Sequence, residues 1–519
     1  MKTFLSVRRT AVVAAASAAA IGAFALPSAA SATPDLGLQC SGANIEGLGS
    51  TFQAPVEKVW TGEAGLLGDG FNVSVSKLAC QGTEIKLKKT KGKPTVKFNQ
   101  EETPTNNKGS GACLKDFGNG ATPRVNQFPF CGTDEAPSAT VEAVMEGHEA
   151  GGQEAKSILS IPVLQGALAV IVHLPSGCTA ASEPKVGKEL KKFNRLALSA
   201  EVVEGIFRGS ITNWKTAVEK SGGSNVLTCT GGTAEEETPI SVVVRADKSG
   251  TTHIFKSWLG QVNETGTWQA EAFNEIEVPT GSGKHEKPCP SALPEEAKTW
   301  VQVQEGCENQ RWPVAAHVIR PTETGNPGVI KEVNADASSI GYADLAVARE
   351  KKVFSEPGVG GEGTDKFWAL VSNSKNKTVA TKQTFQDPST TGDVSNTPGN
   401  SNCKSTKYVN KVGEKFPPES TRDDWSKVKG QYDSTTYGIC GMTYALAARQ
   451  YWYFESPLGV TEAESKEKAT TVANYLLFVL SKATGGGGKE AETQDYYPLP
   501  GTVSKIAETG AKEIGSKEA

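Results

Sequence analysis

Continuous apolar runs and apolar stripes at helical spacing recur along this chain of 519 residues. Ala167 to Val172 is an apolar run with the length of a buried strand. A second apolar run, Ile240 to Val244, precedes a segment from Thr252 to Leu259 that is typical of the start of a helix. Near the C-terminus, Val472 to Thr484 places its apolar residues on one helical stripe, which core packing explains. Length alone suggests about three domains.

Three short segments offer several N–H or O–H donors each: Gly47 to Phe52, Phe130 to Asp134 and Arg245 to Thr252. The third lies between the predicted strand and helix, where unpaired backbone N–H groups and the helix dipole favour an anion. Together the segments supply Arg245 as a fixed cation and Asp134 as a carboxylate. This inventory suits a dehydrated oxyanion. A simple helix N-cap explains the Ser-Gly-Thr-Thr sequence equally well.

The Asp134 carboxylate favours phosphate among the oxyanions. An ionised carboxylate only accepts hydrogen bonds, and phosphate near neutral pH carries at least one P–OH donor, whereas sulfate carries none. Sulfate would leave the carboxylate unpaired in a desolvated pocket, at a cost of roughly several kcal/mol. The alternative is that Asp134 only caps the turn formed by 132–137.

The order and residues of these segments resemble those of the phosphate-binding receptor proteins of ATP-driven phosphate uptake systems. The resemblance covers roughly half of the chain and includes four more segments: Ile161 to Val170, Leu198 to Trp214, Ser339 to Tyr342 and Asp495 to Pro500. Three features depart from the family pattern: Gln53 stands where proline is usual, Lys248 where glycine is common, and the serine loop from Gly109 to Ala112 is Gly-Ser-Gly-Ala and not of the Ser-Ser-Gly-Gly type.

The resemblance implies a set of ligand-binding residues: Thr51, Phe52, Ser110, Asp134, Arg245, Ser249, Gly250 and Thr251. Phe52 would donate its backbone N–H, and Asp247 would orient Arg245. The Asp134 carboxylate would accept the proton of the bound phosphate.

The resemblance also implies the fold, which is of the α/β class with the two-lobed, type II architecture of periplasmic binding proteins and a ligand cleft between the lobes. We expect 33–170 and 345–519 to form lobe I and 171–344 to form lobe II, with Ala167 to Val172 as the first crossing.

The N-terminal 1–32 has the pattern of a secretory signal peptide, with Lys2, Arg8 and Arg9 before an alanine-rich apolar run and Ala30-Ser31-Ala32 before Thr33. No lipid-attachment cysteine is evident there, so we expect a secreted or cell-surface-associated protein. Removing the three basic residues of the signal changes the formal net charge from −4 to about −7. We therefore expect no nucleic-acid partner, and anion capture must depend on local donors.

Three stretches have compositions that bury little, and we expect surface hairpins or long loops there: Thr83 to Lys108, Gly260 to Cys307 and Asn373 to Asp424. The first contains a lysine-rich run, from Lys86 to Lys93, which favours a solvated hairpin face over contact with anionic wall polymers.

The family resemblance implies an extracellular receptor that captures inorganic phosphate and delivers it to the membrane permease of an ABC transporter, acting as a monomer without cofactor or metal. Alternatives are a receptor for another oxyanion, a secreted phosphatase that uses the same anion site, and a wall-associated structural protein. Neither a His-Glu-x-x-His nor a Gly-x-Ser-x-Gly motif occurs, and Ser249 and Thr251 lack an obvious base, although His253 is close in sequence. We therefore expect a binding protein and no enzyme.

All ten cysteines follow the predicted signal peptide. An even number of cysteines in an exported chain, without a Cys-x-x-Cys pair, favours disulfides. We therefore expect five disulfides. Sequential pairing, such as Cys40 with Cys80 and Cys113 with Cys131, would close short loops. Thiol titration of the denatured, unreduced mature protein should find no free thiol, and more than two per chain would contradict the prediction.

Overall fold

The computed structural model describes residues 42–62, 70–72, 94–99, 109–117, 128–146, 157–263, 312, 317–319, 321–352, 354, 365–373, 384–391, 399–410, 414–432, 436–483 and 485–515. The predicted signal peptide, the lysine-rich run from Lys86 to Lys93, and most of the stretch from Gly260 to Cys307 lie outside these residues.

A ten-stranded mixed sheet forms the centre of the fold, with the strand order β11-β10-β12-β4-β18-β3-β1-β2 and with β13 and β19 also paired to β4. Its strands are β1 (Ile45–Gly49), β2 (Val96–Asn99), β3 (Phe130–Thr133), β4 (Ile158–His173), β10 (Ser241–Val243), β11 (Val318–Ile319), β12 (Ser339–Asp344), β13 (Lys366–Trp368), β18 (Cys440–Ala448) and β19 (Tyr496–Tyr497).

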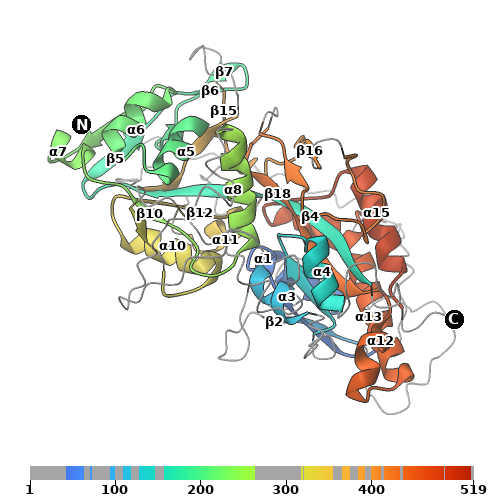
Figure 1. Cartoon of the computed structure of the whole chain (residues 1–519). Helices are drawn as coiled ribbons and strands as arrows, with labels where there is room; N and C mark the ends of the chain where they lie inside the picture. Colours follow the sequence, from blue (N-terminus) through green and yellow to red (C-terminus); the bar gives the residue numbers. More distant parts are fainter. Residues whose placement is uncertain are drawn as a thin grey trace, which may run out of the picture. The chain divides into compact units, whose positions relative to one another are not determined.

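Strand β4 connects the two parts of this sheet (Figure 1). All 16 of its residues are buried, as the apolar run from Ala167 to Val172 predicts for part of it. One end of β4 pairs antiparallel with β18, and the other end pairs antiparallel with β12 and β13. Within each part, parallel strands lie side by side: β1 beside β2 and β3, and β10 beside β11 and β12.

Nine shorter strands form small sheets around the central one. They are β5 (Cys178–Ala181), β6 (Lys185–Val186), β7 (Glu189–Leu190), β8 (Ala197–Leu198), β9 (Val226–Cys229), β14 (Leu370–Ser372), β15 (Phe385–Gln386), β16 (Tyr408–Val409) and β17 (Lys429–Gly430).

The described helices are α1 (Ala54–Thr61), α3 (Ser110–Asp116), α4 (Ala139–Glu146), α5 (Ala200–Arg208), α6 (Trp214–Ser221), α7 (Thr233–Glu236), α8 (Gly250–Val262), α10 (Gly325–Ala335), α11 (Leu345–Glu350), α12 (Tyr451–Glu455), α13 (Glu462–Leu480), α14 (Gly487–Glu490) and α15 (Gly501–Lys512), with 3₁₀ turns η5 (Ser456–Leu458) and η6 (Ala491–Thr493). The predicted C-terminal stripe lies on α13, which begins ten residues earlier, because Thr461 and Glu464 form a capping box there. The combination of helices with a mixed sheet confirms the α/β prediction.

Two of the stretches predicted to be surface loops are partly packed instead. Val96 and Phe98 of β2 are buried, and β2 forms the edge of the central sheet beside β1. In the later stretch, Cys403 and Tyr408 are buried, and Asp387 forms an ion pair with the buried Arg195. A few apolar residues spaced along a polar sequence are sufficient for this packing, and average composition does not reveal them.

Three disulfides join consecutive cysteines among the described residues: Cys113–Cys131, Cys178–Cys229 and Cys403–Cys440. The first confirms the predicted pair, whereas Cys40 and Cys80 lie outside the described residues. In the part of the chain that the structure describes, no helix is long and apolar enough to span a bilayer.

A buried ion pair joins α11 to the segment before β19. The Arg349 guanidinium donates to both carboxylate oxygens of Asp495, at 2.5 and 3.2 Å, and to the Ser389 hydroxyl at 2.8 Å. Both charged side chains are at most 2% exposed. Removing one partner would leave the other charge buried and unpaired.

Replacing Arg349 with Ala should therefore lower the free energy of unfolding by about 3 kcal/mol or more. The control is Lys58→Ala, which removes the half-exposed ion pair with the neighbouring Glu350 and should cost less than about 1 kcal/mol. Denaturant unfolding of both variants measures the difference. Equal losses of the free energy of unfolding in the two variants would contradict the larger stabilising role of the buried ion pair.

Candidate functional site

The predicted binding segments follow the carboxyl ends of parallel strands, where ligands commonly bind in open α/β sheets. Thr51 follows β1, and Asp134 follows β3, which lies beside β1. Arg245 follows β10, and helix α8 begins five residues later. The sheet therefore brings segments from distant parts of the sequence to one place.

The Asp134 carboxylate lies at the centre of a cluster of hydroxyl groups and is only 3% exposed. Its Oδ1 accepts hydrogen bonds from Ser50 Oγ at 2.5 Å and Thr443 Oγ1 at 2.9 Å. Its Oδ2 accepts longer hydrogen bonds from Ser110 Oγ at 3.1 Å and Thr251 Oγ1 at 3.4 Å. One oxygen is therefore held closely, while the other has weaker partners.

Arg245 approaches this cluster from the end of β10 and is 2% exposed. Its guanidinium donates two hydrogen bonds to Asp247, at 2.8 and 2.5 Å. A longer hydrogen bond, at 3.5 Å, reaches Thr251 Oγ1. Asp247 therefore fixes the plane of the guanidinium.

Thr51 meets a residue from another helix, Asn326 at the start of α10. The Thr51 Oγ1 accepts hydrogen bonds from the backbone N–H and the side-chain Nδ2 of Asn326, both at 3.2 Å. The same Nδ2 donates to Thr251 Oγ1 at 3.4 Å. Asn326 therefore links two of the predicted binding residues.

The remaining predicted residues have mainly local roles here. Ser249 caps α8 by accepting a hydrogen bond from Thr252 N at 3.2 Å. The Phe52 N–H donates to Ser50 Oγ at 3.0 Å, and its ring is buried against Tyr496. A Cβ at Gly250 would lie 2.7–2.8 Å from the backbone carbonyl carbon and Cβ of Asp134, so glycine lets the first turn of α8 pack closely against Asp134.

Burial shifts the pKa values of both charged groups. Burial raises the pKa of the Asp134 carboxyl above its ordinary value, and the opposing hydrogen bonds from Ser50, Thr443 and Ser110 and the Arg245 charge do not cancel this. Burial lowers the pKa of Arg245, but the charge and hydrogen bonds of Asp247 outweigh it, so the pKa is raised overall. Arg245 is therefore a permanent cation beside a carboxyl that holds its proton more readily than usual.

Three residues of this cluster were not predicted from the sequence: Ser50, Asn326 and Thr443. Ser50 lies inside a predicted segment, so a search for every hydroxyl there would find it. Thr443 lies inside the apolar strand β18, and Asn326 starts a helix with no other anion-binding signal. Only the fold brings these two residues to the carboxylate.

Gln53 shows how the chain accommodates a departure from the family pattern. Its side-chain Nε2 donates to Thr443 Oγ1 and, at 2.8 Å, to the backbone oxygen of Tyr444. Gln53 therefore supports Thr443, which in turn contacts Asp134. A proline at this position could not make these contacts.

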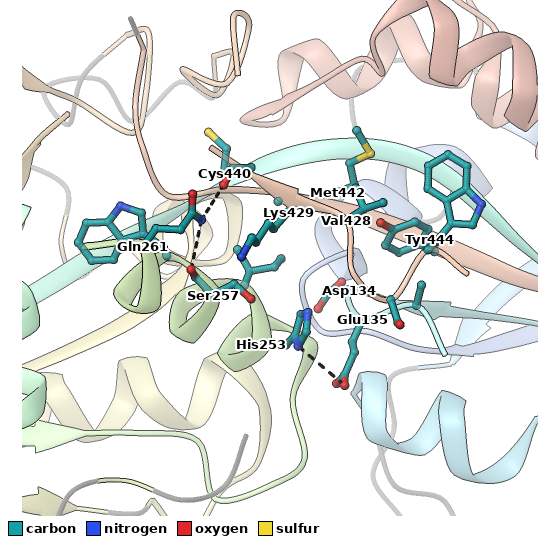
Figure 2. A pocket seen from close by; sticks show the side chains of 17 residues that line it. Asp134, Glu135, His253, Ser257, Gln261, Val428, Lys429, Cys440, Met442 and Tyr444 are labelled. Atoms are coloured by element: carbon teal, nitrogen blue, oxygen red, sulfur yellow. Dashed lines mark hydrogen bonds and ion pairs between the residues drawn. The ribbon is translucent and has the colours of Figure 1, made fainter. Parts of the chain in front are cut away.

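A cavity adjoins Asp134 and extends along α8 (Figure 2). It is lined by α8, the segment after β3, the segment 425–430 and β18. At one side, His253 Nδ1 lies 3.9 Å from Glu135 Oε1. Farther along α8, the Gln261 side chain donates to the Gly430 carbonyl at 2.9 Å and accepts from Tyr432 N at 3.1 Å. Among the described residues, no group of three or more His, Cys, Asp or Glu side chains could hold a metal ion.

Comparison with known proteins identifies the family. The model of the PBP superfamily domain matches residues 43–397, so the chain belongs to the PBP superfamily. This match confirms the predicted periplasmic-binding-protein-like architecture of type II. No curated relative with significant sequence similarity is found.

Solved structures of phosphate-binding proteins are among those similar to this chain. An ancestral soluble variant of the human phosphate-binding protein is 15% identical, with a TM-score of 0.47, and the match covers 92% of this chain and 99% of that one. A high-affinity periplasmic phosphate-binding protein, PfluDING, is 16% identical, with a TM-score of 0.43 and coverage of 92% and 100%. A putative phosphate ABC transporter substrate-binding protein from Clostridium perfringens is 12% identical, with a TM-score of 0.36 and coverage of 88% and 100%.

The raised pKa of Asp134 predicts a pH-dependent stability. The folded state binds the proton more tightly than the unfolded state, so this carboxyl stabilises the fold least at high pH and progressively more as the pH falls through its folded pKa toward about 4. Asp134→Asn removes this titration. The free energy of unfolding of the anion-free variant, minus that of the parent, should therefore increase between pH 4.5 and 7.

Denaturant unfolding at both pH values measures this difference. Glu419→Gln is the control, because it removes one carboxylate from a side chain that is 82% exposed. A difference for Asp134→Asn that does not change with pH would contradict the raised pKa.

Proposed function

We propose that this protein is an extracellular solute-binding protein that captures inorganic phosphate and delivers it to the membrane permease of an ABC transporter. The observation that carries the proposal is the buried Asp134 carboxylate, which lies among hydroxyl donors and beside Arg245. The anion would bind in a cleft between lobe I, formed by 33–170 and 345–519, and lobe II, formed by 171–344. Export would place the mature chain outside the cytoplasm or at the cell surface.

The donors of the cluster would hold the phosphate oxygens. Arg245 supplies a charge that Asp247 keeps in place, and Thr51, Ser110 and Thr251 supply hydroxyl groups. Near the anion, Gly250 brings the positive end of α8, a helix of 13 residues. These groups would bind any tetrahedral oxyanion, so they account for affinity and not for selectivity.

Asp134 would supply the selectivity. Its Oδ1 is held by Ser50 and Thr443, and the more weakly held Oδ2 would accept the P–OH proton of phosphate. Sulfate has no proton to donate, so it would lose this hydrogen bond and face a buried negative charge. Among oxyanions, the cluster therefore favours phosphate.

No observation favours the phosphatase alternative. Hydrolysis through a nucleophilic hydroxyl would need a base in reach. His253 lies 3.9 Å from Glu135, and the carboxylate that the Thr251 hydroxyl contacts, Asp134, is the group assigned here to the P–OH proton. Ser249 accepts a hydrogen bond as the cap of α8.

Titration of purified, anion-free protein with phosphate and with sulfate at one ionic strength tests the proposal. The parent should bind phosphate much more tightly than sulfate. In Asp134→Asn the amide can accept from phosphate or donate to sulfate, so the ratio of the two affinities should fall by about tenfold or more. The ratio is the informative quantity, because it separates selectivity from general loss of binding.

The control is Glu135→Gln, which neutralises the adjacent carboxylate on the cavity side and should leave the ratio unchanged. An unchanged ratio in Asp134→Asn would remove Asp134 from the site. Turnover of an aryl phosphate ester by the parent would instead favour the phosphatase.

A further inference from the structure

Asn326 occupies a central position among the predicted binding residues. It is fully buried, at 0% exposure, and is the second residue of α10. The adjacent Gly325 donates its N–H to Asp247 at 3.2 Å, the carboxylate that orients Arg245. Asn326 itself contacts Thr51 and Thr251, which come from opposite parts of the sheet.

One contact fixes which way the Asn326 amide faces. Its Oδ1 accepts a hydrogen bond from the backbone N–H of Asp344 at 3.3 Å. Because a backbone N–H only donates, the amide oxygen must lie on this side. The Nδ2 group, which only donates, therefore faces the two threonine hydroxyls.

This orientation determines the direction of the hydroxyl protons. Each hydroxyl has two acceptor positions and one proton. Thr51 Oγ1 accepts two hydrogen bonds from Asn326, through the backbone N–H and Nδ2, so its own proton must point elsewhere. Thr251 Oγ1 accepts from Asn326 Nδ2 and from Arg245, and its proton points to Asp134.

We propose that Asn326 is a positioning residue that makes the Thr51 hydroxyl a donor toward a bound oxyanion. This inference rests on the proposed function and extends it. Without the amide, the Thr51 hydroxyl could turn its proton toward another acceptor and present a lone pair to the anion, which would repel it. Asn326 would contribute to the binding of phosphate and sulfate equally, since both present acceptor oxygens, and in this respect it differs from Asp134.

A double-mutant cycle with Asn326→Ala and Thr51→Val tests this role. Phosphate affinity, measured by titration, should fall by about tenfold in Asn326→Ala, the equivalent of one lost hydrogen bond. In the Thr51→Val background the same change should cost only about threefold or less, because the hydroxyl that Asn326 orients is already gone. Sulfate affinity should fall by the same factor as phosphate affinity.

Asn334→Ala is the matched control, because Asn334 lies on the same helix and its side chain accepts from Lys366 instead. It should leave both affinities unchanged. Thermal unfolding checks that each variant is folded, and Asn326→Ser replaces Asn326→Ala in the cycle if the alanine variant does not fold.

The outcomes separate the two proposals. Unchanged affinity in Asn326→Ala, or an equal loss with and without the Thr51 hydroxyl, would overturn the positioning role while phosphate binding by the parent stands. If the parent binds sulfate as tightly as phosphate, and the cycle shows the expected coupling, the phosphate assignment fails while the role of Asn326 stands. A parent that binds neither anion would overturn both.

Discussion

The burial of one carboxylate constrains the whole site. A charge in a protein interior is costly unless hydrogen bonds and opposite charge compensate it. Asp134 receives this compensation from hydroxyl groups on four separate segments and from Arg245. Those segments follow or belong to different strands, so the cluster forms only when both parts of the sheet are assembled around β4. The site therefore depends on the fold more than on any single loop.

In the proposed function, the cluster would separate two tasks of an anion site. Donors with fixed direction, such as Arg245 held by Asp247, provide attraction without distinguishing one oxyanion from another. An acceptor with fixed direction distinguishes one oxyanion from another, because only a ligand that carries a proton can donate a hydrogen bond to it. In our inference Asn326 belongs to the first task, since its amide orients the Thr51 hydroxyl. Burial strengthens both the attraction and the discrimination, because water cannot replace a missing hydrogen-bond partner.

The sequence contains much of this site in local form. The strand-to-helix turn at Arg245 and the carboxylate after the strand ending at Thr133 are visible as short patterns, and the structure brings them together. Thr443 and Asn326 are not visible, because a threonine in an apolar strand and an asparagine at a helix start have many ordinary roles. Their contribution depends on long-range packing, which a single sequence does not report.

The fold itself was predictable to a similar extent. The apolar run from Ala167 to Val172 indicates a buried strand, but not that β4 continues to pair with strands in both parts of the sheet. Polar composition hides the edge strand β2, which buries Val96 and Phe98 against the core. Whether a polar stretch packs depends on a few apolar positions and their partners, and averages over composition miss both.

Helix α8 is held at both of its ends. Its first turn lies against Asp134 at Gly250. Its last turn is joined through the Gln261 side chain to Gly430 and Tyr432. These two residues lie in the loop that the Cys403–Cys440 disulfide closes. A helix fixed at one end can rotate about that end. A helix fixed at both ends can move only if one attachment breaks. Any opening of the candidate site along α8 would therefore have to break the attachments at one end. At the first turn these are the Thr251 hydrogen bonds with Asp134 and Asn326, and at the last turn they are the two hydrogen bonds between the Gln261 side chain and the backbone of Gly430 and Tyr432.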